Sequence, residues 1–247
     1  MNRRRANDFV RDFGGKCGQL PHDWLERFYR SDRATSLRIG RRLLIANGKR
    51  TLARGRCPNS LRGPHILSIP AGAAFGTGEH ATTAMSLRLL EEVTRLRAAE
   101  WRMFDAGTGS GILALAGRLL GAGEILAIDH DPLAIRTAKQ NARTNGIRGV
   151  KFVLADLDRR LFGKFDVITA NLHSELLATV LPRFRRCLVK GGSLVLSGVL
   201  RSQEDQLVTS LGAAGFRSEK IRRRGKWIAL LAVKRDLSQN VSSLQTG

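Results

Sequence analysis

Short apolar runs alternate along residues 101–234 with longer segments whose apolar residues recur every three or four positions. The short runs predict buried strands, and the longer segments predict amphipathic helices. Strands are expected at the residues that lead to Asp105 and at 124–129, 150–155, 165–170 and 194–199. Helices are expected at 110–120, 131–145, 174–187 and 203–214. This alternation predicts an α/β fold built on a doubly wound, mainly parallel sheet.

The two ends of the chain differ from this middle part. Apolar segments at 216–222 and 227–233 are joined by a short basic stretch. They predict an antiparallel C-terminal hairpin that completes a sheet of seven strands. Before the alternating pattern, residues 36–45 predict a strand or a strand pair, residues 65–69 predict a short strand, and residues 23–29 place apolar side chains on one helical face.

Basic residues are concentrated in the first quarter of the chain. The formal net charge is +21, and residues 1–66 hold 16 Lys and Arg against 5 Asp and Glu. A polyanionic partner such as ribosomal RNA would explain this charge. A compositional bias would also explain it, since Arg outnumbers Lys 33 to 9. We interpret 1–66 as a basic N-terminal arm and linker, 67–236 as the main domain and 237–247 as a polar tail.

The remaining composition argues against several classes of protein. No run of 18 apolar residues occurs, so neither a transmembrane helix nor a membrane partner is expected. The charged N-terminus lacks the apolar core of a secretory signal. Three scattered cysteines, Cys17, Cys57 and Cys187, favour a reducing compartment and argue against a metal cluster. We therefore expect a cytoplasmic protein without a metal.

A glycine-rich turn follows the strand that contains Asp105. Gly107, Gly109 and Gly111 stand at every second position before an apolar, helix-like run. Glycines allow a sharp turn and the close approach of a ligand, and the N–H groups at the start of a helix would face that ligand. The G-x-G-x-G spacing differs from the dinucleotide motif, and no lysine follows as in a phosphate-binding loop. Taken alone, the motif is equally compatible with an ordinary glycine-rich turn.

A second acid makes the glycine turn more informative. Asp129 ends the next predicted strand, 22 residues after Gly107, where a carboxylate suits two ribose hydroxyls. A ribose-binding acid beside a turn without phosphate-binding features fits a nucleoside ligand, and S-adenosylmethionine is the obvious candidate. Polar residues end four successive strands, namely Asp105, Asp129, Asp156 and Asn171. Ligands of such sheets bind beyond these carboxyl ends.

A second glycine-rich loop, Ala74–Thr83, precedes another predicted helix. Its expected apolar stripe consists of Met85, Leu89, Val93 and Leu96, and Glu91 is placed to pair with Arg95 four residues later. A loop at a helix start can direct hydroxyl and N–H groups at a ligand. His80 is a candidate base or ligand contact in this loop, and the alternative is an ordinary polar loop residue.

These motifs together resemble the class I S-adenosylmethionine-dependent methyltransferases, which have a Rossmann-like fold. More narrowly, they resemble the ribosomal protein L-eleven methyltransferase family (PrmA). The resemblance covers about residues 24–234 and is strongest in the F-G-T-G-x-H-x-T-T loop, which is more specific than the glycine turn. It is carried by Ala74–Thr83, Asp105–Ala114, Ile128–Pro132, Ala170–Leu172, and Leu196–Leu200 with Gln203.

The resemblance implies a protein methyltransferase that uses S-adenosylmethionine and modifies lysine side chains or the N-terminal amine of a ribosomal protein. It implies that the cofactor is contacted by Thr83, Gly107, Asp129 and Asn171. We add Asp105, Gly109, Gly111 and Asp156 as candidate cofactor-binding residues, although Asp156 fits a helix cap equally well. Asn171 and His173 are candidate catalytic residues, and Phe75, Thr77 and His80 are expected on the substrate side.

The chain departs from the family pattern at several positions. Glu79 replaces a small hydroxyl residue, Ala81 replaces proline, and Leu172-His173 replaces Ile-Leu after Asn171. His173 is a candidate proton acceptor or an ordinary solvent-facing residue. The family's small N-terminal docking domain has no recognisable counterpart here, so we expect either its loss or its replacement by residues 1–66.

Two rival functions remain open at this point. The first is an RNA methyltransferase of the same fold. Methylation of base amines typically uses an Asn/Asp-Pro-Pro-aromatic motif, and Asn171-Leu172-His173-Ser174 has neither proline nor aromatic ring. The second is a non-catalytic binding protein that has kept the fold, for which Glu79, Ala81 and His173 leave room.

Overall fold

The computed structural model describes residues 35–47, 64–70, 80–157 and 163–235. These residues all belong to one compact unit that begins at Thr35. The helix expected at 23–29 and the loop residues Phe75, Thr77 and Glu79 lie outside the described residues. The division of the chain at residue 66 stays a proposal, and the described strands lie on both sides of it.

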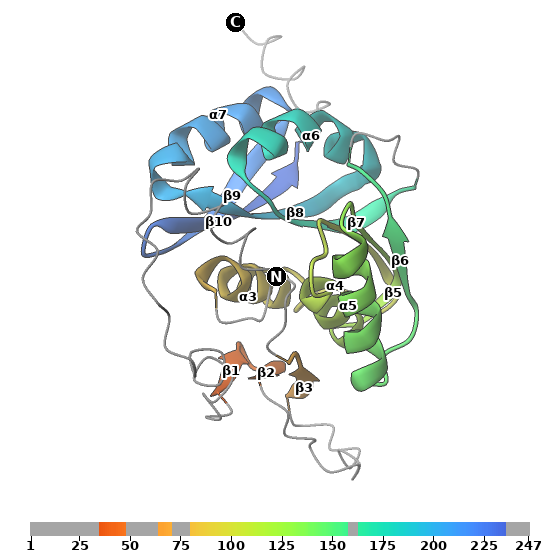
Figure 1. Ribbon diagram of the computed structural model, residues 1–247. Helices are drawn as coiled ribbons and strands as arrows, with labels where there is room; N and C mark the ends of the chain where they lie inside the picture. The colour runs from red at the N-terminus through yellow and green to blue at the C-terminus, as the bar shows by residue number, and fades with distance from the viewer. Residues whose placement is uncertain (1–34, 48–63, 71–79, 158–162, 236–247) are drawn as a thin grey trace, which may run out of the picture. The chain divides into compact units, whose positions relative to one another are not determined.

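The elements follow the predicted alternation of strands and helices (Figure 1). In chain order they are β1 Thr35–Ile39, β2 Leu43–Asn47, β3 His65–Ser68, α3 Ala81–Val93, β4 Trp101–Ala106, α4 Ile112–Leu119, β5 Ala122–Asp129, α5 Pro132–Thr144, β6 Val150–Leu154, β7 Phe165–Asn171, α6 Ser174–Cys187, β8 Leu188–Leu200, the 3₁₀ turn η1 Arg201–Gln203, α7 Glu204–Ala213, β9 Phe216–Arg224 and β10 Trp227–Lys234.

The central sheet has seven strands in the order β6-β5-β4-β7-β8-β10-β9. The first five strands are parallel, whereas β10 runs antiparallel to both β8 and β9. The predicted doubly wound sheet with an antiparallel C-terminal hairpin is therefore confirmed. Because the strand order reverses at β4, ligands are expected beyond the carboxyl ends of β4 and its neighbours.

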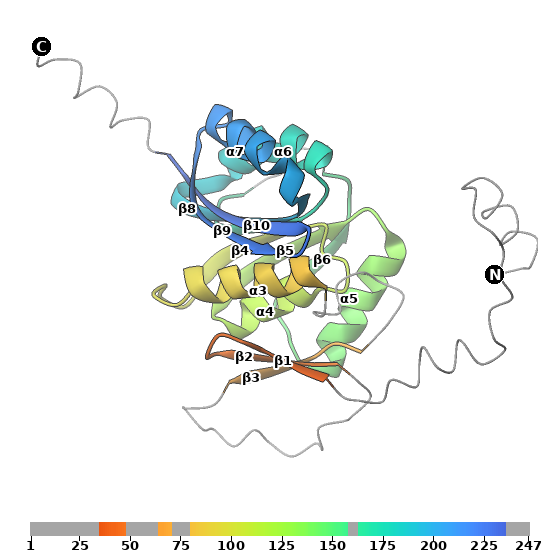
Figure 2. The same ribbon diagram turned by 90° about the vertical axis from the view of Figure 1, so that its left-hand side faces the viewer.

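Helices cover both faces of this sheet, with α6 and α7 on one face and α3, α4 and α5 on the other (Figures 1 and 2). On the first face, Phe104 of β4 packs against Phe184 of α6, with ring centroids 6.1 Å apart. On the second face, Met103 belongs to the cluster that contains Leu115 of α4. Consecutive residues of β4 are thus buried on opposite faces, which explains its largely apolar sequence.

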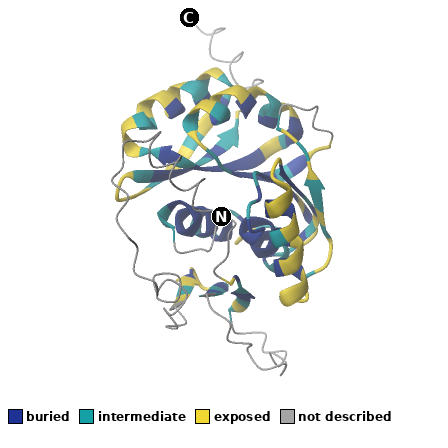
Figure 3. Cartoon of the chain, viewed as in Figure 1, coloured by how far each residue is buried: buried dark blue, intermediate teal, exposed yellow. Residues whose placement is uncertain are grey.

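The helix α3 is buried around most of its circumference (Figure 3). It contacts the large sheet and also the small sheet β1-β2-β3, in which β1 and β2 are antiparallel and β2 and β3 are parallel. This double contact explains why polar residues such as Ser86 are buried in α3. The predicted stripe was wrong at one position: α3 ends at Val93, and Leu96 is 97% exposed beyond it.

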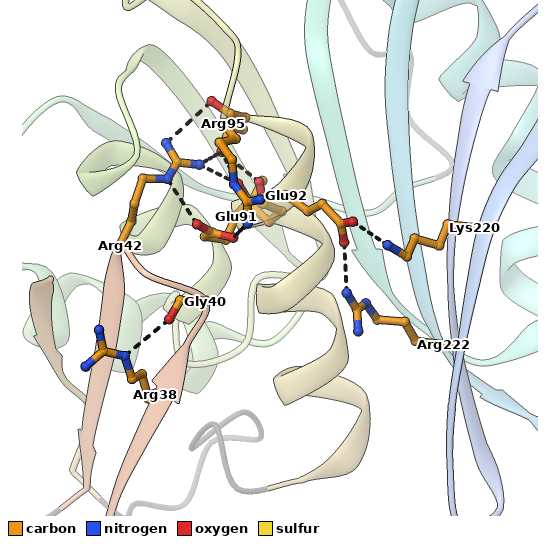
Figure 4. A network of polar contacts seen from close by, with 10 residues as sticks. Arg38, Gly40, Arg42, Glu91, Glu92, Arg95, Lys220 and Arg222 are labelled. Atoms are coloured by element: carbon orange, nitrogen blue, oxygen red, sulfur yellow. Dashed lines mark hydrogen bonds and ion pairs between the residues drawn. The ribbon is translucent and has the colours of Figure 1, made fainter.

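Adjacent glutamates attach α3 to both of its neighbours (Figure 4). Glu91 is 2% exposed and forms ion pairs with Arg42 of the β1–β2 turn at 3.3 Å and, as predicted, with Arg95 at 2.9 Å. Glu92 binds Lys220 and Arg222 of β9. The last three residues of the second glycine-rich loop, 81–83, form the first turn of α3. The contacts of Glu91 and Glu92 therefore also fix the position of these loop residues relative to the sheet.

Candidate functional site

The β4–α4 connection folds as the tight turn that its glycines predict. Gly107, Gly109 and Gly111 all have positive φ, at 72°, 55° and 83°, a region that L-residues with a Cβ rarely adopt. The N–H of Gly107 donates to the carbonyl of Ile128 at 3.0 Å. This bond places the start of the turn beside the end of β5.

Asp105 supports the turn from inside the protein. It is 0% exposed and accepts hydrogen bonds from the hydroxyls of Thr108 at 2.6 Å and Thr169 at 2.5 Å. Burial raises its pKa to about 6, although the two hydroxyl bonds act in the opposite direction. An inaccessible carboxylate with both oxygens bonded is suited to holding the turn against β7.

Asp129 lies at the rim of the same turn. Its Oδ2 accepts from the N–H of Gly109 at 2.9 Å, and its Oδ1 accepts from the N–H of Asp131 at 3.0 Å. Asp131 in turn caps α5, as its sequence predicted, by accepting from the N–H of Leu133 at 2.7 Å. Each carboxylate oxygen of Asp129 has a second lone pair, so the residue can accept two further hydrogen bonds.

A polar cluster joins the start of α3 to the end of β7. The Nδ2 of Asn171 lies 3.4 Å from the hydroxyl of Thr82, and that hydroxyl lies 2.7 Å from Nδ1 of His80. Two buried oxygens of this cluster have no hydrogen-bond partner among the described residues, namely Oδ1 of Asn171 and Oγ1 of Thr83. Unpaired buried polar atoms are costly in a folded protein, so these two oxygens are candidates for contacts with a ligand.

Close backbone packing holds Asn171 in place through the next residue, Leu172. The N–H of Leu172 donates to the carbonyl of Ser197 at 2.9 Å. A Cβ at Gly198 would overlap the carbonyl oxygen of Leu172, and one at Gly107 would lie 2.6 Å from its Cδ2. Leu172 therefore fits between the glycine turn and β8 only because both positions are glycine.

The other predicted residues lie farther from this centre. His173 is exposed at the start of α6, and Asp156 is exposed two residues beyond β6. Within the described residues, no group of three His, Cys, Asp or Glu side chains could hold a metal ion. No described helix has both the length and the apolar character needed to cross a membrane.

Several residues of the site were not assigned a role from the sequence. Thr82, Thr169 and Ser197 contribute polar contacts from three different elements. Trp227 of β10 meets His80 edge to face, with ring centroids 5.3 Å apart. Thr82 and Ser197 fall inside motifs that resemble the family, and this position could have identified them as site residues. No local feature of the sequence indicated that Trp227 would contact His80.

Known proteins with similar sequences fall in one family. The model of the family described as "Ribosomal protein L11 methyltransferase (PrmA)" matches residues 22–235. The ribosomal protein L11 methyltransferase of Pelotomaculum thermopropionicum is 39% identical over 69% of this chain and 54% of its own length. That of Thermus thermophilus is 41% identical over 66% of this chain and 63% of its own length. The chain thus spans little more than half the length of the curated relatives it matches.

Solved structures agree with this similarity. The crystal structure of a ribosomal protein L11 methylase from Lactobacillus delbrueckii subsp. bulgaricus matches with a TM-score of 0.70 and 30% identity, over 81% of this chain and 99% of that chain. A precorrin-6y C5,15-methyltransferase from Geobacter metallireducens matches with a TM-score of 0.52 and 18% identity, over 60% of this chain and 87% of that chain. The second likeness concerns the fold alone.

Proposed function

The chain belongs to the ribosomal protein L11 methyltransferase (PrmA) family, and from this premise we propose that it methylates amines of a ribosomal protein with S-adenosylmethionine. The acceptor would be a lysine side chain or an N-terminal amine. The observation that carries the proposal is the pair of unpartnered buried oxygens of Thr83 and Asn171, which lie at the start of α3 and the end of β7.

The residues around the glycine turn fit the cofactor. Gly107 and Gly109 leave the backbone of the turn without side chains, so a ligand can approach it closely. Asp129 keeps two acceptor positions for the ribose hydroxyls after its bonds to Gly109 and Asp131 are counted. Asp105 positions this turn from below and makes no contact with solvent. Asp156 is exposed near the same edge and remains a candidate for the adenine amino group.

The polar cluster beyond β7 fits the acceptor amine. When bound, S-adenosylmethionine would supply a methyl group on a positively charged sulfur. A neutral amine can take the methyl group in line, and the sulfur leaves as a neutral thioether. Oδ1 of Asn171 would accept a hydrogen bond from that amine and orient its lone pair, because its Nδ2 is directed to Thr82. Positioning of this kind accounts for much of the rate that an enzyme can gain when the electrophile is already activated.

The acceptor must also be neutral. A lysine has a reference pKa of about 10.4, and nearby positive charge lowers that value. The positive sulfur of the bound cofactor would therefore favour the neutral amine. We do not assign an obligatory base, and His173, exposed at the start of α6, is at most an auxiliary proton acceptor. We place the protein in the cytoplasm, where ribosomal proteins are found, and assign it no membrane or metal partner.

The proposal is tested by transfer of labelled methyl groups to ribosomal subunits, which supply both protein and RNA, followed by mass spectrometry of the labelled product. We expect label on lysine or N-terminal nitrogen, unchanged by RNase. Label that is lost on RNase treatment and resides in nucleotides would instead establish the RNA methyltransferase reading. Cofactor binding without any transfer to protein or RNA would favour a non-catalytic homologue. The control is Asn171→Ala, which should bind cofactor but transfer little label.

A further inference from the structure

A basic groove lies at the end of the sheet opposite the candidate site. It has a volume of about 680 Å³, and its described lining includes four cationic residues, Lys164, Arg185, Arg186 and Lys234, and no acidic residue. Lys164 immediately precedes β7, Arg185 and Arg186 end α6, and Lys234 ends β10. Since Asn171 is at the other end of β7, the groove and the site are about 20 Å apart at 3.3 Å per strand residue.

The four charges in this groove are not neutralised within the described structure. Lys164 donates to the carbonyl of Arg186 at 2.7 Å, Arg185 to that of Gly215 at 2.7 Å, and Lys234 to that of Leu188 at 2.8 Å. These bonds hold three of the four side chains, and no carboxylate of the described residues pairs with any of the four, so the partial negative charge at the C-terminal end of α6 offsets only part of their charge. The pKa of Lys234 is lowered by burial and by the like charges of Lys164 and Arg185, which is the signature of cations held close together.

The cluster differs from the paired cations of β9. On β9, Lys220 and Arg222 both bind Glu92, and Arg223 binds Glu204. Those cations are explained by partners within the chain, whereas the groove cations converge from three elements on one open space. The lining of the groove also includes the small apolar residues Ala213 and Ala214. Such a lining admits a sugar or a base beside the bound phosphates.

We propose that this groove binds the phosphate backbone of RNA, at a site separate from the methyl-transfer site. Several fixed cations without an intervening carboxylate match a polymer that presents one negative charge per residue. The overall charge of +21 adds long-range attraction for the same polymer. Because the groove and the site lie at opposite ends of the sheet, RNA can be held while the catalytic edge stays open. The inference does not depend on the proposed amine chemistry.

The test measures binding of the full chain to a fluorescent single-stranded oligouridylate of about 20 nucleotides at several salt concentrations. The groove variant carries Lys164→Gln and Arg186→Gln, since glutamine keeps a donor at both exposed positions. The matched control carries Arg136→Gln and Lys139→Gln on the exposed face of α5, so both variants lose two positive charges. This comparison also subtracts any RNA binding by residues 1–66, which are identical in the two proteins.

Each cation that contacts a phosphate of single-stranded RNA contributes about −0.7 to the slope of log affinity against log salt. We expect the groove variant to reduce the steepness of this slope by about 1.4 and to weaken binding at low salt at least tenfold. The control should change the slope by much less. Equal slopes for the two variants would overturn the proposal, because binding would then follow overall charge alone.

Two further measurements keep the result interpretable. Thermal unfolding and methyl transfer to free protein should be unchanged in the groove variant, which separates loss of RNA binding from misfolding or from loss of the catalytic site. Poly-glutamate serves as a competitor at matched charge concentration. If poly-glutamate displaces the fluorescent RNA as effectively as unlabelled RNA does, the groove recognises acidic polymers in general, and the assignment to RNA is wrong.

Discussion

The N–H of Gly109 donates a 2.9 Å hydrogen bond to Oδ2 of Asp129, and this bond joins the glycine turn after β4 to the end of β5. The two residues are 20 positions apart in the chain. The bond uses one of the two lone pairs on that oxygen and orients the carboxylate at the rim of the turn. Asp129 therefore shapes the turn, and we propose that its remaining lone pairs accept hydrogen bonds from the cofactor.

Replacement of Asp129 by asparagine tests this double contribution. The new amide side chain would have one acceptor oxygen instead of two, so it can keep only two of the four bonds, which are those from Gly109, Asp131 and two ribose hydroxyls. Hydrogen bonds to charged groups are worth about 1.5–3 kcal/mol, and we expect cofactor affinity to fall about 10- to 100-fold by calorimetry. Glu124→Gln is the matched control, since Glu124 also lies on β5 but is exposed and pairs with Arg102. Equal affinity of the two variants would contradict the role of Asp129.

Asn171 and His173 should respond very differently to replacement by alanine. Asn171→Ala removes the buried oxygen proposed to orient the amine, so we expect turnover to fall about 100-fold; an equal fall in cofactor affinity would instead assign Asn171 to the cofactor. His173→Ala alters an exposed side chain and should reduce turnover less than about tenfold, below the roughly 100- to 10,000-fold that a general acid or base typically contributes. Single-turnover methyl transfer measures both effects. A larger loss for His173 would make it the principal catalytic residue instead.

Gly198 should tolerate no side chain. It has φ of 87°, and a Cβ would overlap the backbone of Leu172. We expect Gly198→Ala to destabilise the fold by about 3 kcal/mol or more, because strain and steric overlap combine. Gly212→Ala is the control: this glycine is in α7 and a Cβ there would meet nothing within 4 Å. Since alanine favours helices, that change should stabilise the protein by about 0.5–1 kcal/mol. Urea denaturation measures both.

Glu91 and Glu92 are neighbours with unequal expected contributions to stability. Glu91→Gln would leave Arg42 and Arg95 without their buried partner, and we expect a loss of about 2–3 kcal/mol, toward the lower range for broken buried pairs. Glu92→Gln affects a partly exposed pair with Lys220 and Arg222 and should cost less than about 1 kcal/mol. If the two variants unfold at the same urea concentration, the small sheet is not held through Glu91.

The buried carboxyl of Asp105 predicts a specific pH dependence. Its pKa is about 6 in the folded chain, against 3.8 as the ordinary value. A raised pKa means that the folded state favours the protonated form. The stability that the protonated Asp105 carboxyl contributes is fully present below pH 3.8 and is lost as the pH rises to about 6. This loss amounts to about 3 kcal/mol. Other carboxylates, such as Glu92, have lowered pKa values and act in the opposite direction.

The comparison with Asp105→Asn isolates this effect, because the other carboxylates are the same in both proteins. As the pH rises from about 4 to 6, the unfolding free energy of the wild type should fall relative to that of the variant. The difference between the two should then stay constant at higher pH. A difference that does not vary with pH would show that Asp105 titrates normally in the folded protein.

Much of the fold could be predicted because its signals are local. The spacing of apolar residues predicted the strands and helices from β4 to β10, and Asp131 before Pro132 correctly marked the start of α5. The three glycines correctly marked a turn that requires positive φ. Each of these features depends on neighbours a few positions away, so it can be read from one stretch of sequence. Leu96 was misplaced because the helical spacing continued past the residue at which α3 ends.

The arrangement of the site depended on contacts between distant residues. Only the packed sheet brings Asn171 to Thr82, places Leu172 between Gly107 and Gly198, and buries the Asp105 carboxyl. By itself the sequence determined which polar residues end the strands, because strand ends follow from local apolar patterns. Tertiary structure decided which of these residues lie at the rim of the turn and which are buried beneath it, because burial and hydrogen-bond partners arise only when separate strands pack together.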